Sequence, residues 1–133
     1  MNANEDMIAF VRYRIEKADE VLTAAQVLYD ARQWNSAVNR LYYACFYAAS
    51  AVLLQRGIGA KSHAGVLGMF SEHLVRSHEV SMEDFRVYSK LMNWRTKGDY
   101  GDLFDFTQED LDMVMQPALH FVTIAKGLVQ IPE

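Results

Sequence analysis

The 133-residue chain has the length of one domain, and 51% of its residues are hydrophobic, enough to bury a core. Its 17 acidic residues outnumber its 13 basic ones, and the net charge of −4 argues against a general nucleic-acid binder, because such proteins need a basic surface to displace counterions from phosphates. A local basic cleft is compatible with this balance. The single cysteine excludes a disulfide framework or a cysteine-based zinc site within one chain. We therefore expect one domain over residues 1–133.

The N-terminal sequence MNANEDMIAF carries acidic residues where a signal peptide would carry basic ones before a long apolar run, so we expect a cytoplasmic protein.

The first helix is predicted over about residues 4–31. Apolar residues recur there at alternating steps of three and four, as on one face of an amphipathic helix. That face comprises Ile8, Val11, Ile15, Ala18, Leu22, Ala25 and Tyr29.

The central helix is predicted over residues 34–57, after a short link that makes the first two helices an antiparallel hairpin. Asn35 or Ser36 is its expected cap. Residues 41–54 carry no charge, and apolar side chains lie on every side of this helix, so it must be covered on every side. The stretch is too short to span a bilayer, which needs about 17–25 apolar residues, and we expect no membrane association. Cys45 within it is expected to be a small buried hydrophobe.

Three further helices complete an all-α, up-and-down bundle of about five helices. The third is predicted over about residues 63–77, with Ser62 as its cap and His73 on its inner face. The fourth follows a sequence resembling a capping box at residues 81–84 and is expected to end near Thr96.

Residues 97–102, KGDYGD, are expected to break the fourth helix. A second capping-box pattern, Thr107 to Asp110, predicts the start of the fifth helix. Pro117 lies inside its apolar pattern, so that helix is expected either to kink there or to begin in earnest there. No alternating pattern is long enough to predict a strand, and no internal repeat is present.

The candidate site residues are polar or charged side chains that interrupt apolar rows. Arg95 continues the row of Phe85, Tyr88 and Met92, and a charge in such a row needs a partner, a wet cleft or a ligand. Asn39, Arg40 and Tyr43 share a face of the central helix by their spacing, and His63 begins the third helix. The structural alternative is a buried asparagine that fixes helix register and an arginine whose head reaches solvent.

The four histidines form neither an HExxH motif nor a cluster with carboxylates at metal-ligand spacing. No glycine-rich phosphate loop or nucleophile motif is present. We therefore expect no metal and no cofactor, and the sequence offers little support for a small-molecule enzyme.

Three separated blocks of this sequence resemble the HEPN domain, the helical nucleotide-binding domain of higher eukaryotes and prokaryotes, and in particular its small stand-alone prokaryotic branch. The resemblance covers roughly residues 10–130. The blocks are Ala37 to Ala44 with Phe46 and Ala48; Gly57, then His63 to Val66 with Phe70; and Arg95 to Tyr100.

This resemblance implies a helical bundle, a homodimer and a minimal nucleotidyltransferase partner. Many HEPN members are metal-independent ribonucleases, often the toxin of a toxin and antitoxin pair, and carry an arginine followed four to six residues later by a histidine. Arg95 matches that arginine, but the positions four to six residues later are Asp99, Tyr100 and Gly101. A carboxyl with an ordinary pKa of about 4 is a poor proton donor at neutral pH, and a phenol with a pKa of about 10 is a poor base.

Three hypotheses follow. The first is a noncatalytic module that binds a nucleotide, an RNA phosphate or a nucleotidyltransferase through Asn39, Arg40, Tyr43, His63, Arg95 and Lys97, with Asp99 and Tyr100 beside them. The second is a metal-independent ribonuclease toxin that uses Arg95 with Asp99, Tyr100 or His63 as the substitute acid or base. The third is a structural, oligomerising subunit in which Arg95 and Asp99 clamp a helix end.

Overall fold

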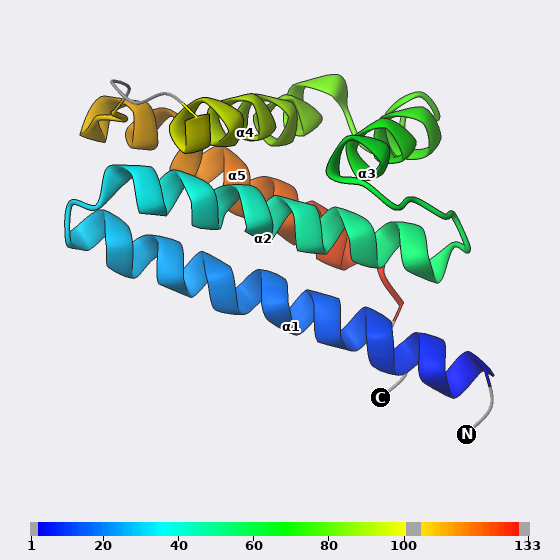
Figure 1. Cartoon of the computed structure of the whole chain (residues 1–133). Coiled ribbons are helices and arrows are strands. Elements are labelled where there is room, and N and C mark those ends of the chain that lie inside the picture. The colour runs from blue at the N-terminus through cyan, green and yellow to red at the C-terminus, as the bar shows by residue number, and fades with distance from the viewer. Residues whose placement is uncertain (1–2, 101–104, 131–133) are drawn as a thin grey trace.

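The computed structural model describes residues 3–100 and 105–130, with side chains over 4–96 and 105–130. This part of the chain forms five α-helices and no strand, which confirms the predicted all-α bundle (Figure 1). A five-residue π-helix, η1, follows α3 directly. The elements are α1 (Ala3–Asp30), α2 (Trp34–Gln55), α3 (His63–Phe70), η1 (Ser71–Val75), α4 (Met82–Tyr100) and α5 (Gln108–Leu128).

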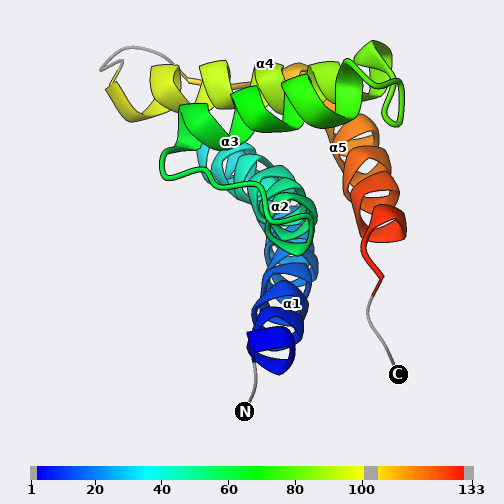
Figure 2. The same ribbon diagram turned by 90° about the vertical axis from the view of Figure 1, so that its right-hand side faces the viewer.

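The helix α2 is the centre of the bundle. It runs antiparallel to α1, and α3 and α4 lie across the top of this hairpin while α5 lies to one side of it (Figure 2). It contacts each of the other four α-helices. The central helix predicted from its apolar surface is therefore confirmed.

Both helices of the hairpin formed by α1 and α2 bury small side chains. Ala18 and Ala25 of α1 are fully buried, as are Ala37, Ala44 and Ala48 of α2. Alanine lets two helix backbones approach closely and loses little side-chain entropy on burial. The alanine rows of α2 thus serve the core of one chain.

The other side of α2 packs against large aromatic rings. The rings of Phe70 and Phe121 lie 5.3 Å apart, those of Tyr88 and Phe121 5.4 Å apart, and those of Tyr42 and Tyr88 6.2 Å apart. These rings come from α2, α3, α4 and α5, so they hold the upper helices to the hairpin. Burial raises the pKa of the Tyr88 hydroxyl, which has no hydrogen-bond partner among the described residues.

Local capping signals set three of the helix starts. Ser62 accepts a hydrogen bond from the amide three residues later at 2.9 Å, and Ser81 does the same at 3.0 Å. Thr107 and Asp110 form the full reciprocal capping box, with distances of 3.2 and 2.9 Å. The caps at Ser62 and Thr107 are confirmed, and at Ser81 the serine half of the predicted capping box is present. Each of these caps uses only neighbours in sequence.

Two predicted boundaries are wrong. The N-cap of α2 is Gln33, without a side-chain cap, because the side chain of Asn35 bonds residues 105 and 106 instead. The helix α4 continues to Tyr100 rather than ending near Thr96, since a single interior glycine costs a helix only about 1 kcal/mol.

One further expectation about helix geometry is wrong, and one of the two alternatives at Pro117 is excluded. The predicted third helix changes to a π-helix at Ser71. Leu74 and Val75 are buried there, whereas His73, expected on the inner face, is exposed. The helix α5 begins at Gln108 and continues through Pro117, so it does not begin at that proline.

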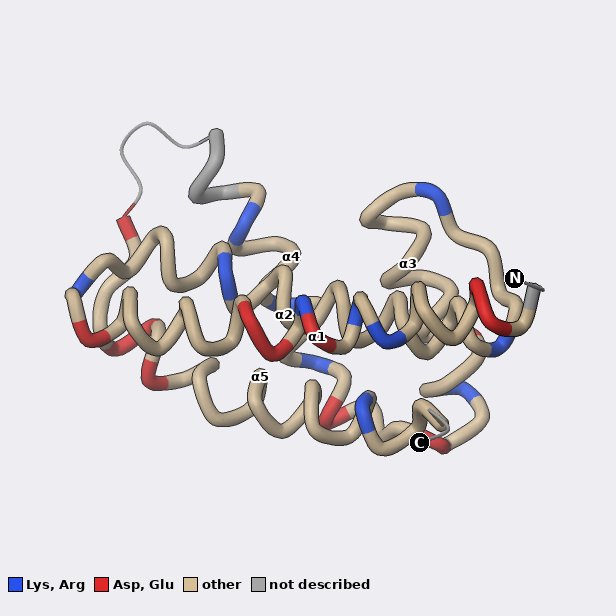
Figure 3. Tube along the Cα trace, turned by 90° about the horizontal axis from the view of Figure 1, so that it is seen from below, with Lys and Arg blue, Asp and Glu red and all other residues tan. Residues whose placement is uncertain are grey.

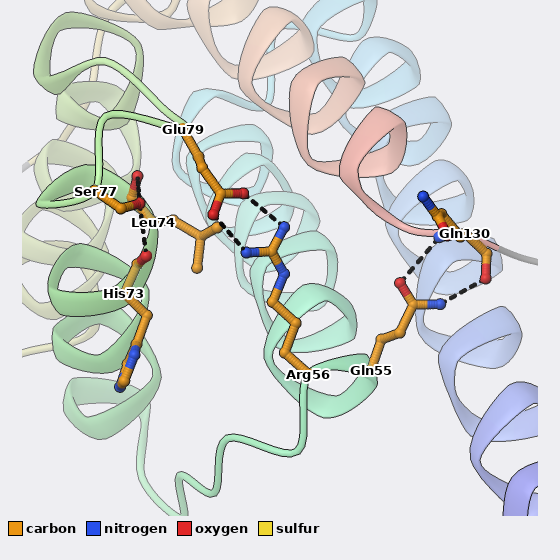
Figure 4. A network of polar contacts seen from close by, with 7 residues as sticks. All are labelled: Gln55, Arg56, His73, Leu74, Ser77, Glu79 and Gln130. Atoms are coloured by element: carbon orange, nitrogen blue, oxygen red, sulfur yellow. Dashed lines mark hydrogen bonds and ion pairs between the residues drawn. The ribbon is translucent and has the colours of Figure 1, made fainter.

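The C-terminal end of α2 is held by side-chain pairs (Figure 4). Arg56 donates two hydrogen bonds to the Glu79 carboxylate, at 2.8 and 2.7 Å. The amide of Gln55 bonds the backbone of Gln130 in both directions. Gly57 has a φ of 72°, a left-handed conformation, and closes the end of the helix with backbone bonds to its last turn.

Acidic and basic residues are interspersed along α1, whereas α2 carries one charged residue, Arg40 (Figure 3). Within the described ranges, no helix is both long enough and apolar enough to cross a bilayer. The one charge on the central helix lies beside the candidate site.

Candidate functional site

Arg95 lies against a pair of tyrosines on the central helix. Its guanidinium carbon is 4.9 Å from the centre of the Tyr42 ring and 5.7 Å from that of Tyr43. Its Nη1 atom also donates to the Tyr43 hydroxyl at 3.3 Å. An aromatic face attracts a cation within about 6 Å, so these rings hold the charge that interrupts the apolar row of α4.

His63 meets the same tyrosines from the start of α3. Its Nδ1 atom is 2.6 Å from the Tyr42 hydroxyl, and its ring stacks on Phe46 with a centroid distance of 4.5 Å. Ser62 caps the helix that carries it. The hydrogen bond and the stacking contact together fix the orientation of the imidazole.

Burial and charge shift the pKa values of this cluster. Burial raises the pKa of the Tyr42 hydroxyl to about 12, against the opposing effect of the nearby Arg95 charge. Burial, and then the charge of Arg95, lowers the pKa of His63 below its ordinary value. At neutral pH the tyrosine is therefore protonated and the imidazole is uncharged.

A pocket of about 360 Å³ opens beside this cluster, between the start of α2 and the end of α4. Its polar lining consists of Asn35, Ser36, Asn39, Arg40 and Arg95, and none of its lining residues is acidic. The first turn of α2, which forms part of the wall, has neither an acidic residue nor a side-chain cap. Two guanidinium groups and the positive end of a helix dipole favour an anion here.

Asn35 closes one side of the pocket. Its Oδ1 atom accepts from the backbone amide of Phe106 at 2.8 Å, and its Nδ2 atom donates to Asp105 at 3.0 Å. The Phe106 ring lines the pocket and packs 5.2 Å from the ring of Trp94. No sequence pattern indicated this role, because the two partners lie about 70 residues from Asn35 along the chain.

The structure brings together five of the sequence-predicted site residues. Asn39, Arg40 and Arg95 line one pocket, while Tyr43 and His63 lie in the aromatic cluster that Arg95 shares. The remaining three candidates lie outside the residues whose side chains are described: Lys97, Asp99 and Tyr100.

Sequence reasoning missed Tyr42 because it counted this residue among the apolar side chains that surround the central helix. The ring is indeed fully buried, but its hydroxyl joins His63 and its face carries Arg95. Among the described residues, no group of three or more His, Cys, Asp or Glu side chains is placed to hold a metal ion.

The fold and this pocket define a small all-α domain with an arginine-lined site on its central helix. A model of the HEPN domain family matches residues 11–128, and the chain belongs to this family.

Relatives of known sequence span nearly the whole chain. A UPF0332 protein of Thermotoga maritima is 35% identical over 98% of this chain and 96% of its own length. "Putative toxin MJ0605" of Methanocaldococcus jannaschii is 35% identical over 96% of each chain. The crystal structure of TT1696 from Thermus thermophilus has the same fold, with a TM-score of 0.76 over 90% of this chain and 98% of that one, at 17% identity.

Proposed function

We propose that this chain is a noncatalytic HEPN module that binds a phosphate group of a nucleotide or of RNA in the pocket between α2 and α4. The observation that carries the proposal is that Arg40 and Arg95, from two different helices, line one pocket with Asn39 and without an acidic residue. A guanidinium binds phosphate through two parallel hydrogen bonds, and an amide adds a neutral donor.

The pocket suits such a ligand in size and in accessibility. Its volume of about 360 Å³ falls within the range of small-molecule sites, roughly 300–1,000 Å³. Arg40 is exposed, and its side chain makes no hydrogen bond or ion pair with the described residues. A phosphate that binds Arg40 therefore breaks no ion pair of the protein, and no carboxylate in the pocket lining competes with it for the guanidinium.

The relatives support a biological setting for this binding. Two of them, at 32% and 35% identity, bear names that call them toxins. We propose that this module acts within a toxin and antitoxin pair, with a minimal nucleotidyltransferase as its partner in the cytoplasm. Toxicity on expression of the chain alone would favour the ribonuclease alternative over the noncatalytic module.

A homodimer is part of the same proposal. The alanines of α2 at positions 37, 44 and 48 are buried within one chain, so the surface that supports the dimer lies elsewhere. On α1, Phe10 and Tyr13 are exposed large hydrophobic residues one helical turn apart. Sedimentation that gives a species near 15.2 kDa at tens of micromolar would contradict the dimer.

The binding test uses a fluorescein-labelled, ten-nucleotide single-stranded RNA in EDTA at low salt, with anisotropy as the measurement. Arg95→Ala is expected to weaken binding by about tenfold or more, because a hydrogen bond to a charged group contributes about 1.5–3 kcal/mol. Arg86→Ala is the matched control, an exposed arginine of the same helix that does not line the pocket. Competition by adenosine 5′-monophosphate separates a nucleotide site from an RNA site.

Two outcomes would overturn the proposal. If Arg95→Ala lowers Tm strongly but retains binding, Arg95 is a structural clamp for the end of α4. If the wild-type protein cleaves the RNA in EDTA to leave a 2′,3′-cyclic phosphate, and both Arg95→Ala and His63→Ala lose this activity, the chain is a ribonuclease.

A further inference from the structure

The Tyr42 hydroxyl is buried, and its bond to His63 has a direction that the surroundings determine. The residue is fully buried, and the one hydrogen-bond partner of its hydroxyl among the described residues is Nδ1 of His63. A hydroxyl carries one proton, and a buried donor without an acceptor is unfavourable. The distance of 2.6 Å marks a short hydrogen bond.

Two arrangements of that proton are available. If Nδ1 carried a proton, it would donate to the hydroxyl oxygen, and the hydroxyl proton would then have no acceptor among the described residues. If Nδ1 is unprotonated, the hydroxyl donates to its lone pair and both atoms are satisfied. The second arrangement leaves the single proton of the neutral imidazole on Nε2.

We propose that Tyr42 fixes His63 as the neutral tautomer protonated at Nε2, so that His63 supplies the Arg95 site with an uncharged hydrogen-bond donor. The inference rests on the proposed phosphate binding, and it adds a second kind of donor to that site. The ligand class is a phosphodiester or phosphomonoester oxygen. His63 does not line the pocket of Arg40 and Arg95 itself, but it shares the Tyr42 and Tyr43 rings with Arg95. Its side chain is half-buried, and its Nε2 atom makes no hydrogen bond with the described residues, so this atom is free to meet a phosphate that Arg95 binds.

The groups that face His63 agree with a neutral ring. Arg95 approaches from α4 and its charge opposes protonation, while Tyr42, Tyr43 and Phe46 of α2 contribute aromatic faces. Among the described residues, no ion pair joins His63 to a carboxylate, and the pKa of the ring is lowered by burial and by Arg95. The imidazole therefore takes up a proton at a lower pH than a free histidine does.

This tautomer has a chemical consequence. A general base that removes the proton of a ribose 2′-hydroxyl needs an unprotonated nitrogen that faces the substrate. In His63 the unprotonated nitrogen faces the buried Tyr42, and the nitrogen left for a ligand carries a proton. His63 therefore does not replace the histidine that ribonuclease members of the family carry after the arginine.

Long-range ¹H–¹⁵N NMR of the full chain, labelled at histidine, tests the tautomer without any ligand. The expected spectrum at pH 8 shows a protonated Nε2 and an unprotonated Nδ1 for His63, and the ring protonates at a lower pH than a free histidine does. Tyr42→Phe removes only the hydroxyl, so it is expected to redistribute the proton between the two nitrogens and to raise the pKa of His63. Tyr43→Phe is the matched control and leaves the proton of His63 on Nε2, because the Tyr43 hydroxyl contacts Arg95 and not the imidazole.

Binding of the trinucleotide UpUpU, whose phosphates are diesters and do not titrate near neutral pH, tests the donor role. His63→Phe keeps the stacking on Phe46 and removes the donor, and we expect about tenfold weaker binding. Wild-type affinity is expected to be constant between pH 7.5 and pH 8.5, where the ring is neutral. Adenosine 5′-monophosphate as a second probe distinguishes a monoester source of the phosphate from a diester source.

The outcomes separate this inference from the proposed function. A spectrum with protonated Nδ1, or unchanged UpUpU affinity in His63→Phe, overturns the donor role while phosphate binding stands. Absence of binding by the wild-type chain to both probes overturns the proposed function and the donor role with it, even where the tautomer is as expected.

Discussion

The two ends of α2 differ in how their polar groups are used. At the C-terminal end, Arg56 is paired with Glu79 through two hydrogen bonds, and Gln55 is paired with Gln130. At the N-terminal end, Arg40 is exposed beside a pocket, and the first turn has no side-chain cap. Arg56 at the C-terminal end thus joins two segments of the chain, whereas Arg40 at the N-terminal end can bind a ligand. Polar groups left open on a rigid helix are typical of binding sites.

Charge reversal at the two arginines is expected to give the largest difference between the ends. Arg40→Glu places a carboxylate in the pocket and should weaken binding of the labelled RNA by about 100-fold, with little change in Tm. Arg56→Glu faces Glu79 with a like charge and should lower Tm while leaving RNA affinity unchanged. Anisotropy and thermal unfolding of both variants check this. An equal loss of RNA affinity in both variants would mean that net charge, and not the pocket, governs binding.

The turns that flank α2 should show a smaller effect, of opposite sign at the two ends. Arg32 and Gly57 both have positive φ, 60° and 72°, but only glycine adopts this conformation without strain. Gly57→Ala is expected to destabilise the protein by about 1 kcal/mol, and Arg32→Gly to stabilise it by about 0.5–1 kcal/mol. Urea unfolding measures both free energies. Stabilisation by Gly57→Ala would show that this turn is not held in the left-handed conformation.

The smallest expected effect is the contribution of His63 to the pH dependence of stability. Its pKa is lowered in the folded chain, so above a pH of about 6.5 the ring is neutral in both the folded and unfolded states. As the pH falls below about 6.5, the unfolded chain binds the proton first, and the folded state loses stability. Unfolding free energies between pH 8 and pH 5 should therefore fall more for the wild type than for His63→Phe. Parallel curves would contradict the lowered pKa.

The sequence predicted the helices well where the signals are local. The caps at Ser62 and Thr107 act within one turn, and the apolar period of the first helix needs no tertiary information. The errors share a different cause. Asn35 acts on residues 105 and 106, and the π-helix after Phe70 depends on how Leu74 and Val75 meet the core, so neither follows from neighbours in sequence.

The part of the candidate site that could be predicted from the sequence is the part where a charged residue interrupts an apolar row. Arg95 was found in this way, and Arg40 lies in the same pocket. The bond between Tyr42 and His63 joins residues 21 positions apart on different helices, and a tyrosine in an apolar row gives no indication of where its hydroxyl points. The roles of Lys97, Asp99 and Tyr100 stay predictions.

The two tryptophans of the chain, Trp34 and Trp94, both lie near the N-terminal end of α2. Trp34 is the first residue of that helix, and Trp94 packs on Phe106, which lines the pocket. The paired end of α2 around Arg56 has no tryptophan of its own. Intrinsic fluorescence excited at the indole band is therefore a label-free reporter of the arginine-lined end alone, and it can follow occupancy of the pocket in the unmodified protein.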